Sequence, residues 1–482
     1  MRHVAPLIAL ALLGGCTMAP KYVRSATPVP PAWPAGDAYA KADTAPLPAI
    51  GYRDIFRDAR LQRIVEQALV NNRDLRVAAA NIAAARAAYR IQHADLFPTI
   101  DAAASDTYRK NSGAGVNNNG GAAGSIANTT SVSVGTTAWE IDLFGRIRSL
   151  NDAALNRYFG TEAGAAATRL TLVGDIATAW LTYASDKSLL AIAEQTAANA
   201  KQSVTLTGRR LSGGIAPRTD LDQAQIVLRT AESDLAQQKT ALAQDVNALQ
   251  LLVGAPVDAA LLPASIEEAG KSVAELPAGL DSRVLLRRPD VLQAEYELRA
   301  TNAEIGAARA ALFPTISLTA LAGFSSTALS NLFTGGAFNY SVAPSVNYPI
   351  FRAGAGRAGV RQSEAQRDAA LATYEKAIQT AFREVSDALA RRGTIADQLK
   401  AQADLVASSS DNYKLSDARY KGGIDSFLQS LTAQQSLYSA RRTQVATQLA
   451  AETNLVTLYR TLGGDASLDV APGDTRPVPT SQ

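Results

Sequence analysis

The chain repeats itself at about half its length, and this duplication constrains the fold more than any other feature. Residues 74–100 align without a gap on residues 290–316, and both segments end in Phe-Pro-Thr-Ile. A second signature recurs in the same order, a Gly-Gly-Ile turn found at Gly213, Gly214 and Ile215 and again at Gly422, Gly423 and Ile424. Two copies of this length indicate a duplicated domain-sized unit and argue against a solenoid of short repeats.

Each unit is predicted to consist mainly of long helices. Residues 56–95 have apolar spacing near 3.6 and predict one helix that ends before Pro98. The segments 146–211 and 353–421 contain no proline, and at about 1.5 Å per residue the first alone reaches roughly 100 Å. After the first Gly-Gly turn a leucine recurs every seven residues, at Leu221, Leu228, Leu235, Leu242 and Leu249. This heptad favours coiled-coil packing over an amphipathic helix on a membrane surface.

Each unit also contains a pair of predicted strands, at 97–108 and 129–144 and at 312–324 and 338–351. Aromatic and aliphatic residues alternate with mostly polar ones from Phe338 to Ile350, and residues 310–351 contain no charged side chain. Alternating strands with one aromatic face are typical of a membrane barrel, in which each crossing needs about ten residues. A soluble β-sandwich insertion is the alternative.

Four strands cannot close a membrane barrel, because an open edge in lipid leaves backbone groups without hydrogen bonds. Several chains therefore have to share one barrel, and three chains would supply twelve strands with cyclic symmetry.

The first residues predict a secretory signal. Arg2 precedes an apolar run, residues 4–15, which is too short to span a bilayer as a helix and is followed at once by Cys16. Residues 13–16 resemble a bacterial lipobox, so we expect cleavage after residue 15 and acylation of Cys16. Thr17 follows where an inner-membrane retention signal usually has Asp, which implies the outer membrane.

The composition excludes several classes of function. A net charge of +3 gives no basic surface for nucleic acid. Two histidines and one cysteine leave no zinc site and no Cys/His pair for nucleophilic catalysis. A carboxylate-based hydrolase using Glu140 and Asp142 remains conceivable, although two residues on one face of a strand are close without any catalytic role.

The predicted organisation has six parts: a signal peptide at 1–15, a lipid-anchored proline-rich strap at 16–54, repeat 1 at 55–253 with its hairpin tip near 211–220, an inter-repeat segment at 254–282, repeat 2 at 283–464 with its tip near 420–428, and a flexible tail at 465–482. Repeat 1 contains the strands 97–108 and 129–144, and repeat 2 contains the strands 312–324 and 338–351.

Three motifs carry a resemblance to a known family: TTAWEIDLFGR at 136–146, RRPD at 287–290 and YEKAIQTAF at 374–382. With the lipidated cysteine, the strap and the repeats, they resemble the lipoprotein branch of the TolC-like outer-membrane factors. The resemblance implies a mainly α fold with a membrane β-barrel part, in which a homotrimer builds a 12-stranded barrel on a helical periplasmic tunnel. It implies an efflux exit duct without catalytic site, cofactor or metal. The implied partners are outer-membrane lipid, a periplasmic adaptor and an inner-membrane transporter of the resistance-nodulation-division class.

The resemblance also places the closed end of the tunnel at the two Gly-Gly tips, where the adaptor is expected to make contact. Thr219 and Asp220 match a pair that ties the helix ends together in TolC-like channels, and Tyr420 matches a tyrosine of the same network. We expect these three residues to form hydrogen bonds that hold the tip closed.

Other gate positions differ from the family pattern. Asp425 stands where TolC has an arginine, and Gln429 and Thr432 replace two rings of aspartate. In the lipoprotein branch Leu428 matches a hydrophobic ring, whereas Thr432 and Gln435 replace the Asp and Arg of the gate. The sequence therefore predicts a neutral, hydrophobic gate centred on Leu428.

Two other functions compete with a drug efflux duct. A structural coiled-coil lipoprotein could hold the envelope layers apart, although such a spacer needs no membrane strands. An exit duct for metal efflux or for type I protein secretion would share the same architecture.

Overall fold

The computed structural model describes residues 17–39, 51–110, 126–274 and 282–464. The predicted signal peptide, Cys16 and the predicted tail lie outside these ranges. The chain divides into two compact units, which we call the sheet unit (Met1–Ser25, Ile82–Thr161 and Ala294–Tyr374) and the hairpin unit (Ala26–Asn81, Glu162–Gln293 and Glu375–Gln482).

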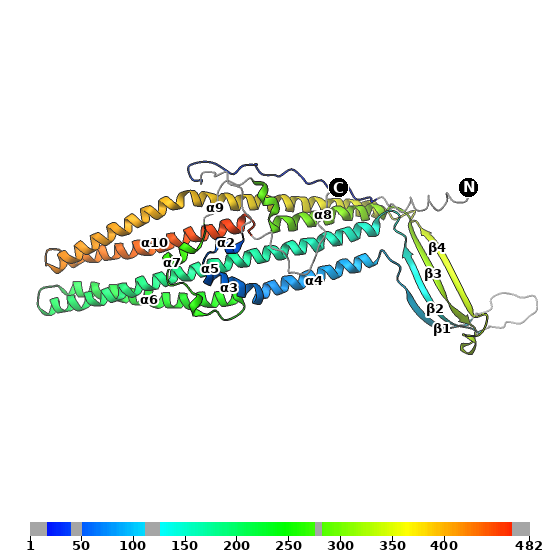
Figure 1. Ribbon diagram of the computed structural model, residues 1–482, viewed down its shortest axis with the longest axis horizontal. Helices are drawn as coiled ribbons and strands as arrows, with labels where there is room; N and C mark the ends of the chain where they lie inside the picture. Colours follow the sequence, from blue (N-terminus) through cyan, green and yellow to red (C-terminus); the bar gives the residue numbers. More distant parts are fainter. Residues whose placement is uncertain (1–16, 40–50, 111–125, 275–281, 465–482) are drawn as a thin grey trace, which may run out of the picture. The chain divides into compact units, whose positions relative to one another are not determined.

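Helices form most of the described chain (Figure 1). Their bounds are α2 (Tyr52–Ile55), α3 (Ala59–Asn71), α4 (Arg73–Ala94), α5 (Arg146–Ser212), α6 (Arg218–Val253), α7 (Ile266–Ala269), α8 (Pro289–Ala310), α9 (Ala355–Lys421) and α10 (Phe427–Thr461). The two proline-free segments thus form the unbroken helices α5 and α9. Among the described helices, none combines the length and apolar character needed to cross a membrane.

The prediction of a single helix over 56–95 is wrong, because the helix is interrupted at Asn72, between α3 and α4. The Asn72 side chain accepts a hydrogen bond from the Leu75 amide at 3.0 Å and donates one to the Leu252 carbonyl at 2.7 Å. It therefore caps the start of α4 and the end of α6 at once, and a buried amide with two partners outweighs the continuous helical periodicity.

Arg288 makes the corresponding junction in the second repeat. Its guanidinium donates to the Thr461 carbonyl at the end of α10, at 2.9 Å, and binds Asp290 and Glu384 at 2.7 and 2.9 Å. The first junction uses a neutral amide and the second uses a buried, fully paired charge. Both satisfy backbone groups that a helix end leaves open.

The four strands form one antiparallel sheet in the order β1-β2-β3-β4. They cover β1 (Asp101–Lys110), β2 (Ile126–Glu140), β3 (Thr315–Ser326) and β4 (Phe338–Asn347). The predicted ranges differ from these bounds by a few residues at either end. The central pairing joins β2 to β3, so that the two repeats meet inside the sheet. Among the described residues, β1 and β4 have no partner on their outer sides.

Two glycines allow the repeats to approach closely between β2 and β3. A Cβ atom at Gly135 would lie 2.0 Å from the Ala320 carbonyl oxygen, and one at Gly323 would lie 2.1 Å from that of Val132. Side chains are therefore excluded at both positions.

The core of the hairpin unit is built around a few large side chains that are fully buried. Trp180 on α5 donates its indole N–H to the Leu261 carbonyl at 3.0 Å, and Phe56 meets the Tyr459 ring edge-on at 5.4 Å. The first contact packs the segment between the repeats against α5, and the second packs the residue after α2 against α10.

The first described residues are bound to the sheet unit through a buried carboxylate. Glu295 on α8 is 2% exposed and accepts hydrogen bonds from Tyr22, Arg24 and Arg299 at 2.7–3.2 Å. Burial raises the pKa of Glu295, but the two arginines outweigh burial and hold it below the ordinary value. The N-terminal strap is therefore fixed along α8 by paired charges.

Candidate functional site

The two hairpin tips have the same backbone geometry. Gly214 and Gly423 have φ angles of +71° and +75°, a region that favours glycine. The next residue closes each turn: the Ile215 amide donates to the Arg210 carbonyl at 2.8 Å, and the Ile424 amide donates to the Arg419 carbonyl at 2.9 Å. The repeated Gly-Gly-Ile sequence thus reverses the chain after α5 and after α9, and it leaves both isoleucines exposed.

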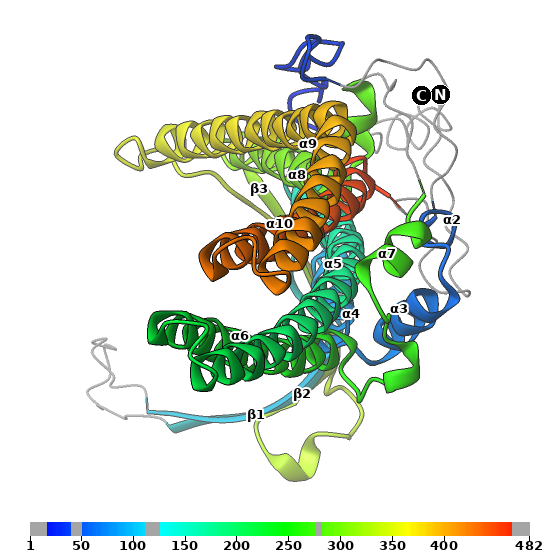
Figure 2. The same ribbon diagram turned by 90° about the vertical axis from the view of Figure 1, so that its left-hand side faces the viewer.

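The two hairpins of the hairpin unit lie side by side (Figure 2, α5 and α6 in green, α9 and α10 in yellow to red). Near the tips they share a buried cluster of Ala224, Tyr420, Phe427 and Leu431. The Arg210 guanidinium lies over the Tyr420 ring, 4.6 Å from its centre, and donates to the Tyr420 carbonyl at 3.0 Å. Arg210 is therefore a link between the hairpins, and the sequence analysis did not identify it.

The expected tie between Tyr420 and Asp220 is not present within the described chain. The Tyr420 hydroxyl is buried and has no hydrogen-bond partner, because the ring is turned into the cluster beside Phe427. Thr219 is exposed and Asp220 is half-buried, and neither side chain makes a hydrogen bond or ion pair to the described residues around it. This part of the predicted network is thus not formed among the described residues of one chain, and its role at the gate stays a prediction.

Asp425 is held inside its own turn. Its carboxylate accepts two hydrogen bonds from Arg419, at 2.6 and 3.0 Å. These bonds lower the pKa of Asp425 below its ordinary value. The charge at this position is paired within one hairpin and does not connect it to the other.

The remaining gate residues share one exposed face of α10. Leu428 is 57% exposed, Gln429 and Gln435 are exposed, and the Thr432 hydroxyl donates back to the Leu428 carbonyl at 2.9 Å. Leu428, Thr432 and Gln435 are spaced by four and three residues and therefore lie in one stripe. Phe427 and Leu431 face the cluster instead.

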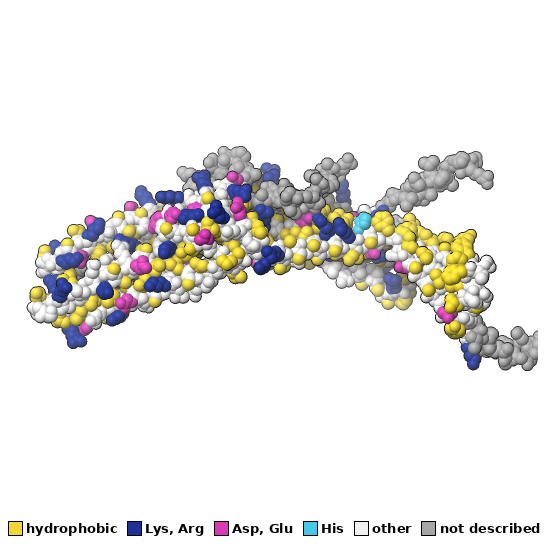
Figure 3. Space-filling view, turned by 60° about the horizontal axis from the view of Figure 1, so that its bottom comes forward, with side chains coloured by type: hydrophobic (Ala, Val, Ile, Leu, Met, Phe, Trp, Pro, Cys, Tyr) yellow, Lys and Arg dark blue, Asp and Glu magenta, His cyan; other side chains and the backbone are white. Residues whose placement is uncertain are grey.

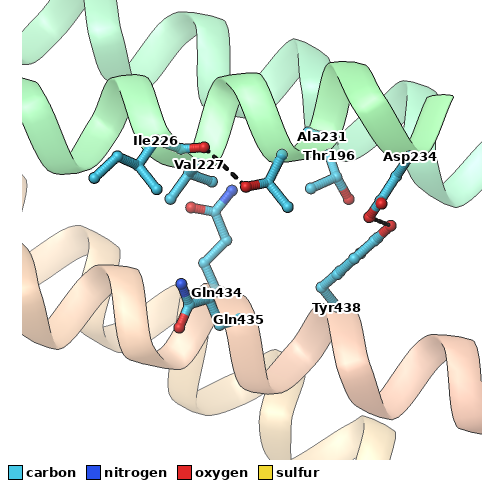
Figure 4. Close-up of a pocket in the computed structure, with 9 residues that line it drawn as sticks. Thr196, Ile226, Val227, Ala231, Asp234, Gln434, Gln435 and Tyr438 are labelled. Carbon is cyan, nitrogen blue, oxygen red and sulfur yellow. Dashed lines mark hydrogen bonds between the residues drawn. The ribbon is translucent and has the colours of Figure 1, made fainter. Parts of the chain in front are cut away.

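A cavity of about 80 Å³ lies between α6 and α10, further from the tips than the buried cluster (Figure 4). It is lined by Thr196, Ile226, Val227, Thr230, Ala231, Asp234, Gln434, Gln435 and Tyr438. At one end the Tyr438 hydroxyl donates to the Asp234 carboxylate at 2.6 Å. The side chain of Gln434 is buried between the helices, and its Nε2 has no acceptor. Sequence reasoning missed Asp234, Gln434 and Tyr438, since polar side chains on separate helices give no local signal.

The sheet exposes a regular row of large apolar side chains. They are Phe338, Tyr340, Val342 and Val346 on β4, each at least half exposed, and the row continues beyond the end of the strand with the exposed Tyr348 and Ile350. Figure 3 shows hydrophobic side chains gathered over the strands. An apolar row with period two on an open sheet is the surface that lipid covers in a membrane barrel.

Glu140 and Asp142 are each paired with an arginine. Glu140 accepts hydrogen bonds from Arg146 at 2.7 and 2.9 Å, and Asp142 accepts one from the Arg148 amide at 2.9 Å and pairs with its guanidinium. Each carboxylate thus fixes the start of α5. Over the part of the chain that the structure describes, no group of three or more His, Cys, Asp or Glu residues is arranged to hold a metal ion.

Comparison with known proteins identifies the class. The family model of the outer membrane efflux proteins matches residues 64–255 and 280–464, so the match itself falls into the two repeats. The chain belongs to this family.

Individual relatives match over almost the whole length. The antibiotic efflux pump outer membrane protein ArpC and the toluene efflux pump outer membrane protein TtgC, both of Pseudomonas putida, are each 43% identical over 455 residues, which is 94% of this chain and 93% of theirs. The crystal structure of a membrane protein from Pseudomonas aeruginosa is 38% identical and covers 93% of this chain and 98% of its own, with a TM-score of 0.85. The open state of the Neisseria gonorrhoeae MtrE outer membrane channel is 32% identical and covers 94% and 99%, with a TM-score of 0.83.

These findings confirm the family, the fold class and the function predicted from the sequence. The chain is a mainly helical outer-membrane efflux protein with two repeats and a strand part, and it acts as an exit duct. The family is that of the outer membrane efflux proteins, and MtrE is an outer membrane channel.

Proposed function

We propose that the chain is the exit duct for antibiotics and apolar organic solvents, delivered by an inner-membrane resistance-nodulation-division transporter through a periplasmic adaptor. The observation that carries the proposal is the open four-stranded sheet with an exposed apolar row. Relatives named for antibiotic efflux and toluene efflux support the substrate class. The duct itself binds no cofactor and catalyses no reaction.

Three copies of the chain form the duct. The edge strands β1 and β4 have open hydrogen-bonding groups that lipid cannot satisfy, so each edge pairs with a neighbouring copy. Three copies give the twelve strands of the proposed barrel, and the helices of the same three copies surround a periplasmic tunnel.

Cys16 is the proposed lipid anchor. Its neighbour Thr17 lies against Ser149 in the first turns of α5, with 3.5 Å between the two hydroxyl oxygens, and α5 begins shortly after β2 ends. This supports an anchor at the level of the strand ends. Mass spectrometry of the first peptide is expected to show an acylated Cys16, and an unmodified N-terminus would contradict the anchor.

Leu428 is the proposed gate. In a symmetric trimer each residue near a hairpin tip occurs three times around the axis, and three leucines would form a dry constriction that blocks ions without charge. Thr432 and Gln435 continue this stripe as neutral side chains. Gln429 and Thr219 border the tip, and the adaptor contacts the turns Gly213, Gly214, Ile215, Gly422, Gly423 and Ile424.

Native mass spectrometry in detergent tests the shared barrel. We expect one species with three times the mass of the mature chain and with full strand content by circular dichroism. A monomer that retains full strand content in detergent would contradict the proposal, because four strands cannot satisfy their own edges.

Cells that lack the protein should accumulate toluene and lose antibiotic resistance, and normal tolerance in such cells would refute the substrate class.

A further inference from the structure

Tyr438 and Asp234 connect the two hairpins at a point well away from the tip (Figure 4). Tyr438 lies on α10 and Asp234 on α6, and the hydroxyl and the carboxylate are 2.6 Å apart. Arg442 lies one turn further along α10. Its guanidinium approaches the same carboxylate at 3.9 Å and lies 5.4 Å from the centre of the Tyr438 ring. Two residues on one face of α10 therefore bind a single acidic residue of the other hairpin.

The bond is partly buried. The Asp234 side chain is 22% exposed, so protein atoms cover most of the carboxylate. Burial and the hydrogen bond to Asp234 raise the pKa of Tyr438 to about 12, and the hydroxyl therefore remains a donor at every physiological pH. A hydrogen bond to a charged group is among the stronger side-chain interactions.

Packing beside the bond is incomplete. The cavity next to it is bordered by Val227 and Ala231, and the buried Gln434 leaves one donor without an acceptor. Apolar contact is therefore weak where the hydrogen bond is strong. At the cavity α6 and α10 are therefore held more by this polar bond than by close packing. The hairpins are also joined by the buried cluster nearer the tip and by a hydrogen bond of 2.9 Å from Arg441 on α10 to Gln195 on α5.

The tip itself has no bond of this kind. Tyr420 has a buried hydroxyl without a partner, and Asp220 makes no side-chain bond within the described chain. Asp234 lies 14 residues after Asp220 on α6, which is about 21 Å further along the helix. The tyrosine–aspartate pair within this chain is thus found at the cavity and not at the turn.

We propose that the hydrogen bond between Tyr438 and Asp234 is a tie that keeps the two hairpins of each chain together while the duct is closed, and that it breaks when the duct opens. This inference rests on the proposed gate at the hairpin tips. Arg442 supports the bond as a positioning residue, since it holds the carboxylate and covers the ring.

The test compares two tyrosines that differ in one respect. Tyr438→Phe and Tyr420→Phe both remove a hydroxyl and keep the ring, but only the first hydroxyl has an acceptor among the described residues. In single-channel recordings of the full lipidated protein in planar bilayers, we expect Tyr438→Phe to raise the open probability about tenfold, equivalent to about 1.4 kcal/mol. Tyr420→Phe is expected to change it less than twofold. Equal effects of the two substitutions, or no effect of Tyr438→Phe, would overturn the proposal.

A second pair of variants separates the bond from a general loosening of the helices. In an Asp234→Ala background the hydroxyl of Tyr438 has lost its acceptor, so adding Tyr438→Phe should raise the open probability no further. If the two effects multiply instead, the residues act independently and the tie is wrong. If the proposed function as a duct is wrong, the recordings differ from all of these results, because no variant conducts, Leu428→Gly included.

Discussion

The two helical hairpins share the Gly-Gly-Ile turn sequence, but the arginine that precedes the turn has a different partner in each. In the second hairpin Arg419 binds Asp425 of its own turn. In the first hairpin Ala216 occupies the position of Asp425, and Arg210, which matches Arg419, reaches across to Tyr420 instead. A single missing carboxylate thus decides whether an arginine closes its own turn or joins the other hairpin. The second tip is self-contained, whereas the first depends on its neighbour.

Tyr420→Ala should have the largest effect on this arrangement. It removes a buried ring from the cluster with Phe427 and Leu431, and truncating a buried aromatic side chain costs about 3 kcal/mol. Hydrogen exchange should show that both turns lose protection, because the Arg210 guanidinium of the first hairpin packs on the same ring. If only the second turn loosens, the cluster does not join the two hairpins.

Arg210→Ala and Arg419→Ala distinguish the linking arginine from the local one. Arg210→Ala removes a bond to a carbonyl and a contact with an aromatic face, together about 1 to 2 kcal/mol, and should raise amide exchange in both tips. Arg419→Ala should affect the second turn alone. Identical exchange maps for the two variants would contradict the difference between the tips.

Ala216→Asp should convert the first tip into a copy of the second. The new carboxylate would offer Arg210 a partner in its own turn, which competes with the Tyr420 carbonyl. We expect the same exchange pattern as for Arg210→Ala, with a smaller amplitude. Ala216→Asn, which lacks the charge, is the matched control and should leave the exchange pattern of the parent.

The carboxyl pair Asp186 and Asp245 should make the stability of the first hairpin depend slightly on pH, and the second hairpin has no matching pair. Burial and the neighbouring Asp186 raise the pKa of Asp245 to about 6. The folded state therefore favours the protonated form, and stability falls as the pH rises from the ordinary aspartate value of about 4 through about 6. The matching positions of the second hairpin are Ile395 and Asn454.

Thermal unfolding between about pH 4 and pH 7 measures this difference. Asp245→Asn introduces the residue type of the matching Asn454 and should reduce the change of the unfolding temperature with pH. If that change is the same in the variant as in the parent, other groups cause the pH dependence.

Sequence reasoning succeeded where a local rule determines the structure. The Gly-Gly turns are predictable because Gly214 and Gly423 must adopt positive φ, and α5 and α9 because proline is absent from them. The break at Asn72 was not predictable, since helical periodicity continues through it and its cause is the carbonyl of Leu252, far away in the sequence.

The same limit applies to the site. The exposed stripe of Leu428 follows from helical spacing, whereas the contacts of Arg210, Asp234 and Tyr438 depend on which helices become neighbours. The Tyr420 hydroxyl has no partner among the described residues for the same reason, because packing beside Phe427 determines where it points.

The gated duct is tested most directly by the single-channel conductance of Leu428→Gly beside the parent protein in planar bilayers. The parent should show small and rare openings, and Leu428→Gly should conduct several-fold more, because three glycines cannot form a dry constriction. Thr219→Gly, at the matching position of the first hairpin, should have a smaller effect. If Leu428→Gly conducts like the parent while Thr432→Ala or Gln435→Ala opens the pore, a polar latch and not a hydrophobic ring closes the duct.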